Sequence, residues 1–548
     1  MTDEYPEYLD FGEEAFQKRP ALKGHLGDAV FRMLAKHPGR VVLVDCTAKR
    51  REMSAGKLLA VSTALSQRWK DSIPGKRVGI VFPPGMGAYI ANLAVVLCGK
   101  VPVNLNFTLG PTAIGSCIRR AGIETIITAA PVKQKVPNFP WVEDTRDIVG
   151  DLQALSKTTV IRLLLMIWLF PAGWLARRLG VPQHGDNEEA GLLFSSGSTG
   201  EPKGVVLTHR NIIGNCFQIA DIELLPRSEV LLACLPIFHS FGFTVTLWYP
   251  LLTGMKVITL PSPLEQKRIA ETVEAEGATV LLGTPTFYRP YFKRVAPGKL
   301  KNLKYVVAGA EKTPNGFHEK WEANFGNLYL EGYGLTETSP VVSCNLPDFI
   351  ARGKESLLKR DGSVGKPFPG IRARITHPDT GETQSPYETG MLQLRGPNIF
   401  PGYLDEPSLN AAVFSDGWFI TGDLARFDED GFLYIEGRVS RFSKIGGEMA
   451  PHGSIEEHIV RAFDLEGNDH PVIAVTGVAD AVKGERLVLL TTVDLSPADL
   501  RDRLVKAGLP NLWIPREIKR VDAIPCLASG KLDLKEIADL AAGEESGQ

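Results

Sequence analysis

Cysteine is scarce in this sequence. The 548 residues include seven cysteines, at positions 46, 98, 117, 216, 234, 344 and 526. No two of them stand at zinc-ligand spacing, and an odd, scattered set is a poor framework for disulfides. We therefore expect reduced thiols in a cytoplasmic protein.

An excess of either charge is also missing. Lys and Arg total 61 against 63 Asp and Glu, which gives a net charge of −2. A nucleic-acid-binding protein would have a clearly basic balance, so the composition argues against that class. The first residues, Met1 to Tyr5, are acidic and lack an apolar core, and we expect no signal peptide.

Charge of either sign is also missing from one short apolar segment. It extends from Leu163 to Ala176 (LLLMIWLFPAGWLA) and is flanked by Arg162, Arg177 and Arg178. Its fourteen residues fall short of the ~20 that a helix needs to cross a bilayer. Pro171 also interrupts any long helix.

Tryptophans and flanking arginines in such a segment are typical of the membrane interface. The sequence therefore predicts a cytoplasmic protein that contacts the inner face of the membrane peripherally through residues 158–180. A buried hairpin and a contact between subunits are the alternatives.

Length and composition indicate a folded protein with more than one domain. A chain of 548 residues exceeds the usual size of one core, and 44% hydrophobic with 23% charged residues argues against disorder. Apolar β-branched runs such as Arg77–Phe82 and Thr279–Leu282 stand beside helical stretches such as Met86–Leu97, which predicts an α/β protein. Dense turn residues after about position 360 indicate short antiparallel strands.

We expect a domain boundary near residues 437–441, where this pattern changes again. It would separate a large domain of mixed sheets and helices, residues 1–437, from a small α+β domain, residues 438–548. The apolar insert at about 158–180 would belong to the large domain.

The strongest local motif is Leu192–Val206 (LLFSSGSTGEPKGVV). Its loop can offer backbone N–H groups and hydroxyls to an anion, and Lys203 adds a mobile positive charge for phosphate oxygens. The spacing is not that of a Walker A loop. A flexible linker, the alternative, would not need apolar strands on both sides. The loop residues are Ser195, Ser196, Gly197, Ser198, Thr199 and Gly200.

A second motif is Glu331–Pro340 (EGYGLTETSP). Its glycines, among them Gly334, would let the backbone pass close to a ligand, and Tyr333 offers a flat face for a base. Thr336 and Glu337 offer oxygens of the kind that a magnesium–phosphate complex needs. Taken alone, the string could also be a capped turn.

These motifs resemble those of the adenylate-forming superfamily, which comprises acyl-CoA synthetases, peptide-synthetase adenylation domains and luciferases. The resemblance recurs at intervals through residue 531. It implies a large N-terminal adenylation domain that binds ATP and the acyl group, a small mobile C-terminal domain, and the use of ATP and magnesium. It also implies that Tyr333 stacks on adenine, that Thr336 meets phosphate and that Glu337 helps to hold magnesium.

Two further motifs complete the implied nucleotide site. Gly309, Ala310 and Glu311 resemble the loop that lines the adenine pocket. Asp423 resembles the aspartate that binds both ribose hydroxyls, for which the two oxygens of a carboxylate are well suited, and Arg438 is its usual companion. The alternative for Asp423 is a turn residue beside glycine.

The small domain carries the last two motifs. Lys531, in PCLASGKLD, resembles the catalytic lysine that neutralises charge between the carboxylate and the α-phosphate. The string Lys444–Met449 (KIGGEM) resembles the loop presented for the second reaction, with Lys444 and Gly447 at the cofactor. Ser440 departs from the pattern, because relatives usually have Asp or Lys at this hinge position.

The stretch Pro236–Phe243 (PIFHSFGF) resembles the acid pocket and places His239 beside the acyl and thiol path; a core histidine is the alternative. Relatives that activate amino acids have an aspartate after the aromatic residue. Here Gly242 follows Phe241, so an amino acid substrate is not expected. Apolar neighbours predict a tunnel for an alkyl chain, namely Phe243, Leu247, Trp248, Tyr249, Phe287 and Tyr288.

The resemblance implies a two-step reaction. The carboxylate of a fatty acid attacks the α-phosphorus of ATP, and pyrophosphate leaves. The small domain then rotates, and a thiol attacks the acyl adenylate with AMP as the leaving group. The expected catalytic residues are Lys531, Glu337, Thr336, His239 and Lys203, with Glu337 on magnesium.

The thiol is the least defined part of this prediction. The apolar insert and Arg441–Met449 resemble the acyl-ACP synthetase half of bacterial acyltransferase/acyl-ACP synthetase proteins, which favours acyl carrier protein. Residues 438–548 hold 14 Lys and Arg against 18 Asp and Glu, however, and show no basic character for an acidic carrier.

Three other functions remain open. They are a long-chain acyl-CoA ligase, a β-lactone-forming synthetase and a non-catalytic nucleotide-binding scaffold. The presence of Lys531, Glu337 and Asp423 argues against the scaffold.

Overall fold

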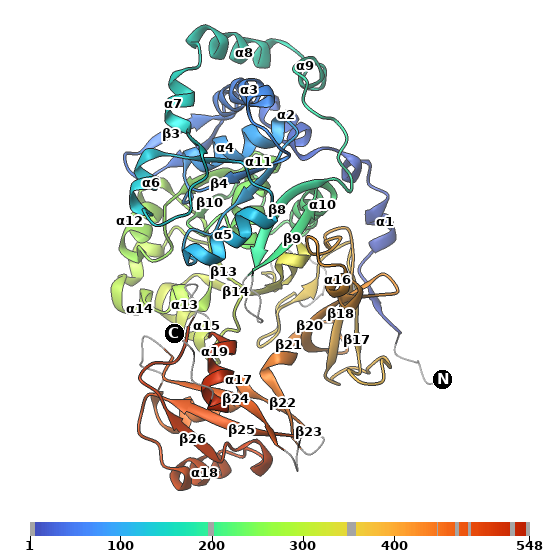
Figure 1. Cartoon of the computed structure of the whole chain (residues 1–548), viewed down its shortest axis with the longest axis vertical. Helices are drawn as coiled ribbons and strands as arrows, with labels where there is room; N and C mark the ends of the chain where they lie inside the picture. Colours follow the sequence, from blue (N-terminus) through green and yellow to red (C-terminus); the bar gives the residue numbers. More distant parts are fainter. Residues whose placement is uncertain are drawn as a thin grey trace.

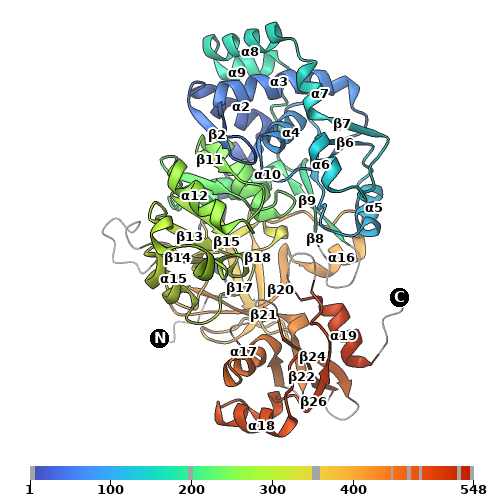
Figure 2. The same cartoon turned by 90° about the vertical axis from the view of Figure 1, so that its left-hand side faces the viewer.

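The computed structural model describes residues 6–195, 202–347, 358–445, 448–465, 471–480, 484–526 and 532–543. The molecule is elongated, with the N-terminal two thirds of the chain at one end and the C-terminal part at the other (Figures 1 and 2). Sheets and helices alternate, so the predicted α/β class is confirmed. No helix in the described ranges is long and apolar enough to cross a bilayer.

The largest sheet is built around parallel strands. In the described part of the chain its nine strands have the order β16-β15-β14-β13-β12-β10-β11-β2-β3. Pairing is parallel from β14 to β2, and the strands at both edges are antiparallel. The bounds are β2 (Val41–Asp45), β3 (Arg51–Ser54), β10 (Val230–Ala233), β11 (Lys256–Thr259), β12 (Val280–Gly283), β13 (Tyr305–Ala308), β14 (Leu328–Gly334), β15 (Val341–Cys344) and β16 (Lys366–Pro367).

Helices cover both faces of this sheet, which explains why its central strands read as continuous apolar runs. Successive residues of a strand point to opposite faces: Leu231 packs into one hydrophobic cluster and Leu232 into the other. The helices of this region are α10 (His209–Asp221), the π-helical η2 (Phe241–Trp248), α11 (Tyr249–Thr253), α12 (Gln266–Glu276), α13 (Pro285–Tyr288), α14 (Tyr291–Arg294) and α15 (Phe317–Phe325).

A second, all-parallel sheet has the order β5-β4-β6-β7. The helix α4 beside it is buried from Ala88 to Leu97, and a sequence without charged residues suits such a position. The strands are β4 (Arg77–Ile80), β5 (Val101–Asn104), β6 (Thr125–Thr128) and β7 (Asp144–Asp147). The helices are α1 (Glu13–Gln17), α2 (Leu26–Lys36), α3 (Ala55–Ser72), α4 (Met86–Leu97), α5 (Pro111–Arg120), α6 (Ala130–Lys135) and α7 (Ile148–Gln153).

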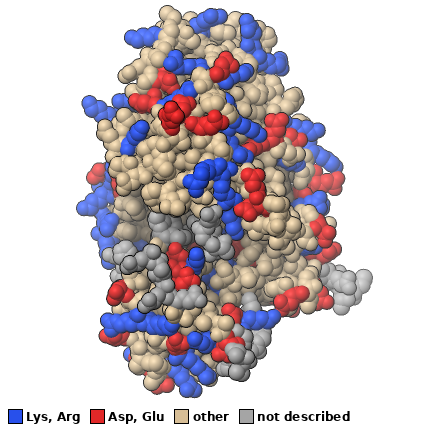
Figure 3. Space-filling model, in the orientation of Figure 1, with Lys and Arg blue, Asp and Glu red and all other residues tan. Residues whose placement is uncertain are grey.

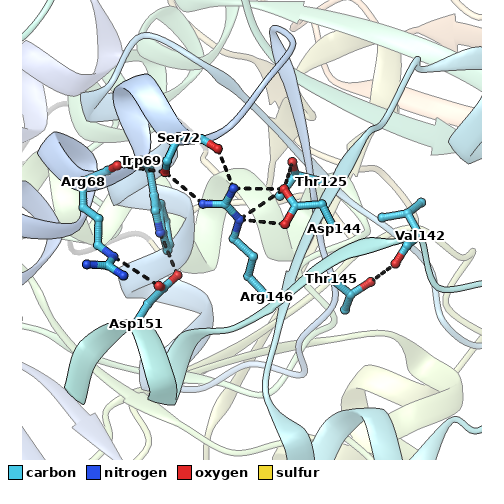
Figure 4. A network of polar contacts seen from close by, with 9 residues as sticks. All are labelled: Arg68, Trp69, Ser72, Thr125, Val142, Asp144, Thr145, Arg146 and Asp151. Atoms are coloured by element: carbon cyan, nitrogen blue, oxygen red, sulfur yellow. Dashed lines mark hydrogen bonds and ion pairs between the residues drawn. The ribbon is translucent and has the colours of Figure 1, made fainter. Parts of the chain in front are cut away.

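A group of polar contacts fixes α7 and β7 against α3 (Figure 4). Asp151 accepts a hydrogen bond of 2.8 Å from Trp69 Nε1 and lies 3.3 Å from Arg68 Nε. Arg146 bridges Asp144, at 2.9 Å, and the Ser72 hydroxyl, also at 2.9 Å. The chain then continues into α8 (Lys157–Leu169) and α9 (Ala172–Arg178), which lie at one end of the molecule in both views.

Two antiparallel units complete the large domain. The hairpin of β8 (Glu189–Ser195) and β9 (Lys203–Thr208) leads into α10. The other unit has the order β1-β17-β18-β20-β19, with β21 beside β20. It consists of β1 (Leu9–Asp10), β17 (Arg372–Thr376), β18 (Gly390–Arg395), β19 (Phe414–Ser415), β20 (Trp418–Phe427) and β21 (Leu433–Arg438), with α16 (Pro407–Val413) beside it.

The C-terminal part has its own sheet, of order β23-β22-β25-β24 with β26 beside β25. The members of its two hydrophobic clusters all follow residue 444 in the sequence. The elements are β22 (Phe442–Ile445), β23 (Glu448–Pro451), β24 (Ile473–Asp480), β25 (Gly484–Thr491), β26 (Glu517–Arg520), α17 (His452–Ala462), α18 (Pro497–Lys506) and α19 (Leu534–Ala542). The domain boundary at 437/438 stays a prediction; β21 includes Arg438, one residue beyond it.

Candidate active site

The topology of the largest sheet gathers several predicted residues at one edge. Ligands of parallel α/β sheets bind beyond the carboxyl ends of the strands. β10 ends six residues before His239, β13 ends immediately before Gly309, and β14 ends two residues before Thr336. These strands run in parallel, so the segments that follow them lie at the same edge.

Gly309, Ala310 and Glu311 form the turn after β13. The backbone N–H of Gly309 donates to the Gly283 carbonyl at 3.1 Å, and Ala310 has a positive φ of 67°. Glu311 Oε2 accepts a hydrogen bond of 2.6 Å from the Thr286 hydroxyl at the start of α13. Since the Glu311 carboxylate faces α13, the backbone of the turn is the part presented to a base.

Asp423 and Arg438 are direct partners across the β20–β21 pair. Arg438 Nε lies 3.3 Å from Asp423 Oδ1, and the Tyr333 hydroxyl donates a hydrogen bond to Oδ2. Burial raises the pKa of the Asp423 carboxyl, and the positive charge of Arg438 offsets part of this rise. The side chains predicted for base and ribose thus form one connected group.

Glu337 belongs to a second group, which also contains Lys203. The Tyr403 hydroxyl donates to Glu337 Oε1 at 2.8 Å, and Lys203 Nζ lies 5.7 Å from the centre of the Tyr403 ring. Burial, with the adjacent carboxylate, raises the pKa of Tyr403, so its hydroxyl keeps its proton and remains a donor. Tyr403 was not predicted, because only the fold brings this loop residue beside Glu337.

A buried network of amides holds the loop that carries Thr336 and Glu337. Asn398 Nδ2 donates to the Thr338 carbonyl at 2.8 Å, and its own carbonyl accepts from the Ser339 hydroxyl at 2.8 Å. Asn215 Nδ2 donates to the Val341 carbonyl at 2.7 Å. Sequence reasoning missed these residues, since isolated asparagines carry no local signal.

Gly334 has a packing role within the protein, and its predicted approach to a ligand stays a prediction. A Cβ atom at this position would lie 2.1 Å from the carbonyl oxygen of Pro340, so glycine is required where β14 and the following segment approach each other. Gly334 also borders the cavity described below, but its missing side chain makes room for the protein's own backbone.

The phosphate loop is bounded by a regular hairpin. Ser195 and Lys203 are register partners at the ends of β8 and β9. The predicted residues Ser196, Gly197, Ser198, Thr199 and Gly200 lie outside the described residues.

His239 is exposed in the segment that follows β10, which excludes the core histidine as its explanation. Its ring lies 4.8 Å from that of Phe238. The next residue, Ser240, places its hydroxyl 3.3 Å from that of Thr336. The structure therefore brings the His239 segment beside Thr336.

An apolar cavity of about 90 Å³ lies directly beside the nucleotide residues. Gly309 and Tyr333 border it together with Leu224, Phe241 and Val245. An acyl chain placed there would have its carboxylate end toward the adenine turn.

The residues predicted to line an alkyl tunnel do not line this cavity. Because residues 241–248 are helical, Phe241 and Val245 share the stripe that faces it, while the rest of the segment points elsewhere. Trp248, for example, is fully buried in the core. None of the predicted set borders the cavity: Phe243, Leu247, Trp248, Tyr249, Phe287 and Tyr288.

Gly242 leaves no room for any side chain. A Cβ atom there would lie 2.1 Å from the Pro236 carbonyl oxygen. An aspartate that could hold an α-ammonium group does not fit this backbone, which supports the exclusion of amino acid substrates.

The small domain presents little of its predicted site here. Lys444 Nζ lies 2.9 Å from Asp379 Oδ2, in the loop after β17, and therefore does not join the nucleotide residues. Gly447 and Lys531 lie outside the described residues. Helix α19, which begins at Leu534, faces the large domain, whereas α18 lies at the far end (Figures 1 and 2).

Known proteins similar to this chain include several ligases. The long-chain-fatty-acid–CoA ligase of Bacillus subtilis (strain 168) is 32% identical over 360 residues, which are 64% of this chain and 61% of that protein. The ligase of the same name from Salmonella typhimurium is 26% identical over 498 residues, 86% of each chain. A feruloyl-CoA synthase from Amycolatopsis sp is 28% identical over 468 residues, 84% of this chain and 87% of the relative.

Solved structures share the fold. That of o-succinylbenzoate coenzyme A synthetase (MenE) from Bacillus subtilis, in complex with ATP and magnesium ion, has a TM-score of 0.77 at 22% identity, covering 93% of this chain and 98% of its own. ATP-bound MatB from Rhodopseudomonas palustris has a TM-score of 0.74 at 24% identity, covering 94% and 99%.

The sequence profile of the family described as AMP-binding enzyme matches residues 30–404, which is more than half of the chain. This match spans the phosphate loop, the adenine turn and the Tyr333 motif. The predicted relationship to the adenylate-forming superfamily is therefore confirmed, and the chain belongs to the family of AMP-binding enzymes.

Proposed function

We propose that this enzyme activates a long-chain fatty acid with ATP as an acyl adenylate and then transfers the acyl group to the thiol of coenzyme A. The observation that carries the proposal is the apolar cavity beside Gly309 and Tyr333, because it offers an alkyl chain a place next to the nucleotide residues. Relatives named long-chain-fatty-acid–CoA ligases support both the acid and the thiol.

In the first step a carboxylate oxygen forms a bond to the α-phosphorus as the bond to pyrophosphate breaks. Most of the catalysis in such a transfer is positioning and charge stabilisation. Asp423 and Arg438 would hold the ribose and Tyr333 the base, so that the α-phosphate meets the acid at the cavity entrance. Lys203, on the strand that leaves the phosphate loop, supplies positive charge.

The enzyme uses ATP together with magnesium, and Glu337 fits the ion. Its Oε1 is held by Tyr403, while Oε2 makes no hydrogen bond within the described residues. Magnesium is usually bound through one or two carboxylates together with substrate phosphates. When bound, the ion offsets phosphate charge; Tyr403 fixes the direction of the carboxylate that receives it.

In the second step the thiol attacks the acyl carbonyl and AMP leaves. We propose that the small domain rotates between the steps, since Lys444 is turned away from the nucleotide residues in this arrangement. Beyond the Arg438–Asp423 pair, ion pairs between described residues of the two domains include Lys444 to Asp379 at 2.9 Å and Lys312 to Glu457 at 3.8 Å. Exposed pairs are worth ~0–1 kcal/mol each, so they would oppose a rotation only weakly.

Coenzyme A replaces acyl carrier protein as the proposed acceptor. The relatives are named as CoA ligases, and the resemblance of the insert to acyl-ACP synthetases has no support from them. The test supplies ATP, magnesium and palmitate with coenzyme A or holo-acyl carrier protein in parallel, and measures thioester and AMP. Palmitoyl-CoA is expected. Thioester formed only on the carrier protein would overturn the acceptor and leave the first step intact.

Peripheral contact with a membrane through residues 158–180 belongs to the same proposal. Long-chain acids partition into bilayers, because each buried CH₂ is worth ~0.8 kcal/mol. An enzyme that consumes such acids gains substrate by working at the bilayer surface. We propose the inner face of the membrane as its location.

A further inference from the structure

The pair α8–α9, residues 157–178, carries a concentration of exposed apolar side chains. In the described part of the chain, six of the twelve large hydrophobic residues that are exposed lie here. Leu165, Trp168 and Leu169 are 56%, 59% and 74% exposed. Monomeric proteins rarely expose a contiguous apolar patch of this kind unless it meets a partner. The six are Ile161, Leu165, Trp168, Leu169, Phe170 and Trp174.

The patch lies on a firmly packed helix. On the inner side of α8, Leu163 and Ile167 are buried against the core that includes α3. Ile161, Leu165 and Trp168 follow the i, i+4, i+7 spacing of a single outer stripe. Helix α8 is therefore apolar on both sides. The inner side is buried, whereas the outer side stays mostly exposed, although the ring of Trp168 lies beside Gly39.

The base of this pair of helices is fixed by polar contacts. Asp151 ties α7 to Trp69 and Arg68 of α3 (Figure 4). At the tip, the ring of Phe170 stacks on that of Trp174, with centroids 5.1 Å apart. The exposed rings are thus held in place by the fold.

The charges of the segment itself have one sign. From residue 152 to 185 the sequence contains no Asp or Glu, and it contains Lys157, Arg162, Arg177 and Arg178. None of these four cations forms an ion pair with another described residue, although ion pairs are common elsewhere in the protein. Figure 3 shows that the surface at this end of the molecule is mostly uncharged, with Lys and Arg at its edges and acidic side chains farther down.

We propose that α8 and α9 lie flat on an anionic lipid bilayer, with the outer stripe of α8 among the acyl chains and the four cations at the headgroups. The thirteen residues of α8 give it a length of roughly 20 Å, too short to span the hydrocarbon core. Tryptophan and arginine are the residues favoured at the headgroup level. Unpaired cations complement anionic headgroups and have no comparable use against a neutral protein surface.

This orientation leaves the small domain unobstructed. Helices α8 and α9 lie at the end of the molecule opposite α18 in both views (Figures 1 and 2). The proposed domain rotation would therefore take place away from the bilayer. The biological reason for membrane binding would be the supply of fatty acid, and in this respect the inference rests on the proposed function.

The first test measures co-sedimentation of the full chain with vesicles of phosphatidylcholine, alone or mixed with phosphatidylglycerol. The triple variant Leu165→Ser/Trp168→Ser/Leu169→Ser is expected to bind mixed vesicles at least tenfold more weakly than the wild type. Exposed positions are chosen because serine there does not disturb the buried side of α8. Vesicle binding equal to that of the wild type would overturn the proposal.

A matched control removes exposed apolar groups from other surfaces. Leu264→Ser/Tyr387→Ser/Val505→Ser alters residues that are also exposed. This variant is expected to bind vesicles like the wild type. If it loses as much binding as the α8 variant, the attraction is general hydrophobicity and the proposed surface is wrong.

A second pair of variants tests the charges. Arg177→Glu/Arg178→Glu is expected to weaken binding to mixed vesicles at least about 25-fold at low salt, since each lost cation is worth about fivefold. Binding to neutral vesicles is expected to stay unchanged. Arg501→Glu/Lys506→Glu on α18 makes the same change of charge at the far end and is expected to have no effect. Equal effects of the two pairs would refute the orientation.

The rival occupant is a second copy of this chain. The membrane proposal would be overturned in favour of a subunit interface by two results together. The wild type would fail to bind vesicles, and it would form a dimer while the triple serine variant is monomeric. AMP release with detergent-dispersed palmitate is measured on every variant and should be unchanged. Vesicle binding by a wild type that releases no AMP would refute the proposed function and leave the membrane surface standing.

Discussion

The substitution Asp423→Asn tests how this protein holds the ribose of ATP. Asp423 is 3% exposed, and both of its oxygens have partners, Arg438 and Tyr333. A hydrogen bond to a charged group contributes ~1.5–3 kcal/mol. Asparagine keeps one acceptor oxygen of the two, so we expect a loss of about 2–3 kcal/mol, or about 30- to 150-fold in kcat/KM for ATP.

The folded state should tolerate this change. Burial raises the pKa of Asp423, which means that the folded protein disfavours its ionised form at neutral pH. Replacing it by a neutral isostere relieves that cost, while Arg438 stays accessible to water. We therefore expect a melting temperature close to that of the wild type.

The assay compares ATP with 2′-deoxy-ATP in pyrophosphate release at saturating palmitate. The wild type should lose much of its kcat/KM with the deoxy nucleotide, and Asp423→Asn should lose far less, because the contact is already gone. Tyr333→Phe is the matched control: it removes the hydrogen bond inside the protein and leaves both carboxylate oxygens to the ribose. Equal sensitivity of wild type and Asp423→Asn to the missing hydroxyl would refute the reasoning.

Four further predictions address the rest of the site and the fold. Lys531→Ala should abolish pyrophosphate release while circular dichroism shows an intact fold; near-normal release would refute the assignment of this lysine. Tyr403→Phe should raise the magnesium concentration needed for half-maximal rate about tenfold, because Glu337 loses a charge-assisted hydrogen bond of ~1.5–3 kcal/mol, and an unchanged magnesium dependence would contradict this role. Val245→Phe should lower kcat/KM for palmitate at least tenfold and spare butyrate, as measured by AMP release; equal losses for both acids would place the alkyl chain elsewhere. Burial lowers the pKa of His25 to about 4, and its unfolded value is near 6.5, so the unfolded chain takes up its proton first as pH falls. Stability should therefore fall by roughly 2 kcal/mol between pH 7 and pH 5 on account of this residue, and urea unfolding of His25→Asn at both pH values should show a correspondingly smaller loss.

Local patterns predicted much of the fold. The apolar stretch Met86–Leu97 is a helix with those same bounds, and the runs at Arg77 and Thr279 are strands. In each case the signal lies within the element itself, as a period or as an uninterrupted apolar run between turn residues. The dense turn residues after position 360 are likewise a local signal. The antiparallel strands β17 to β21 confirm the prediction made from them.

Contacts between residues far apart in the sequence were the part of the site that could be predicted only where the resemblance already supplied them. The contact between Asp423 and Arg438 was expected because the resemblance already placed both at the ribose. Tyr403 contacts Glu337, which lies 66 residues earlier in the sequence. Asn398 contacts Thr338, which lies 60 residues earlier. No local sequence pattern around either residue indicates its partner. The packing of the sheets against one another brings such residues together, and a single sequence does not show how the sheets pack.

The cavity shows a different limit. The residues that follow Phe241 are mostly apolar, so composition alone suggested that the aromatic side chains face the substrate. The helical twist of η2 turns only Phe241 and Val245 toward the cavity, and Trp248 supports the core. Hydrophobicity predicted that an apolar site exists, and the backbone geometry decided which side chains form it.

The central claim is that this protein joins an acid to AMP before any thiol takes part. Exchange of labelled pyrophosphate into ATP, measured without a thiol, tests it most directly. Exchange should require both palmitate and magnesium, and it should disappear in Asp423→Asn at low ATP. Absence of palmitate-dependent exchange in a folded, ATP-binding protein, or release of ADP in place of AMP, would contradict the account.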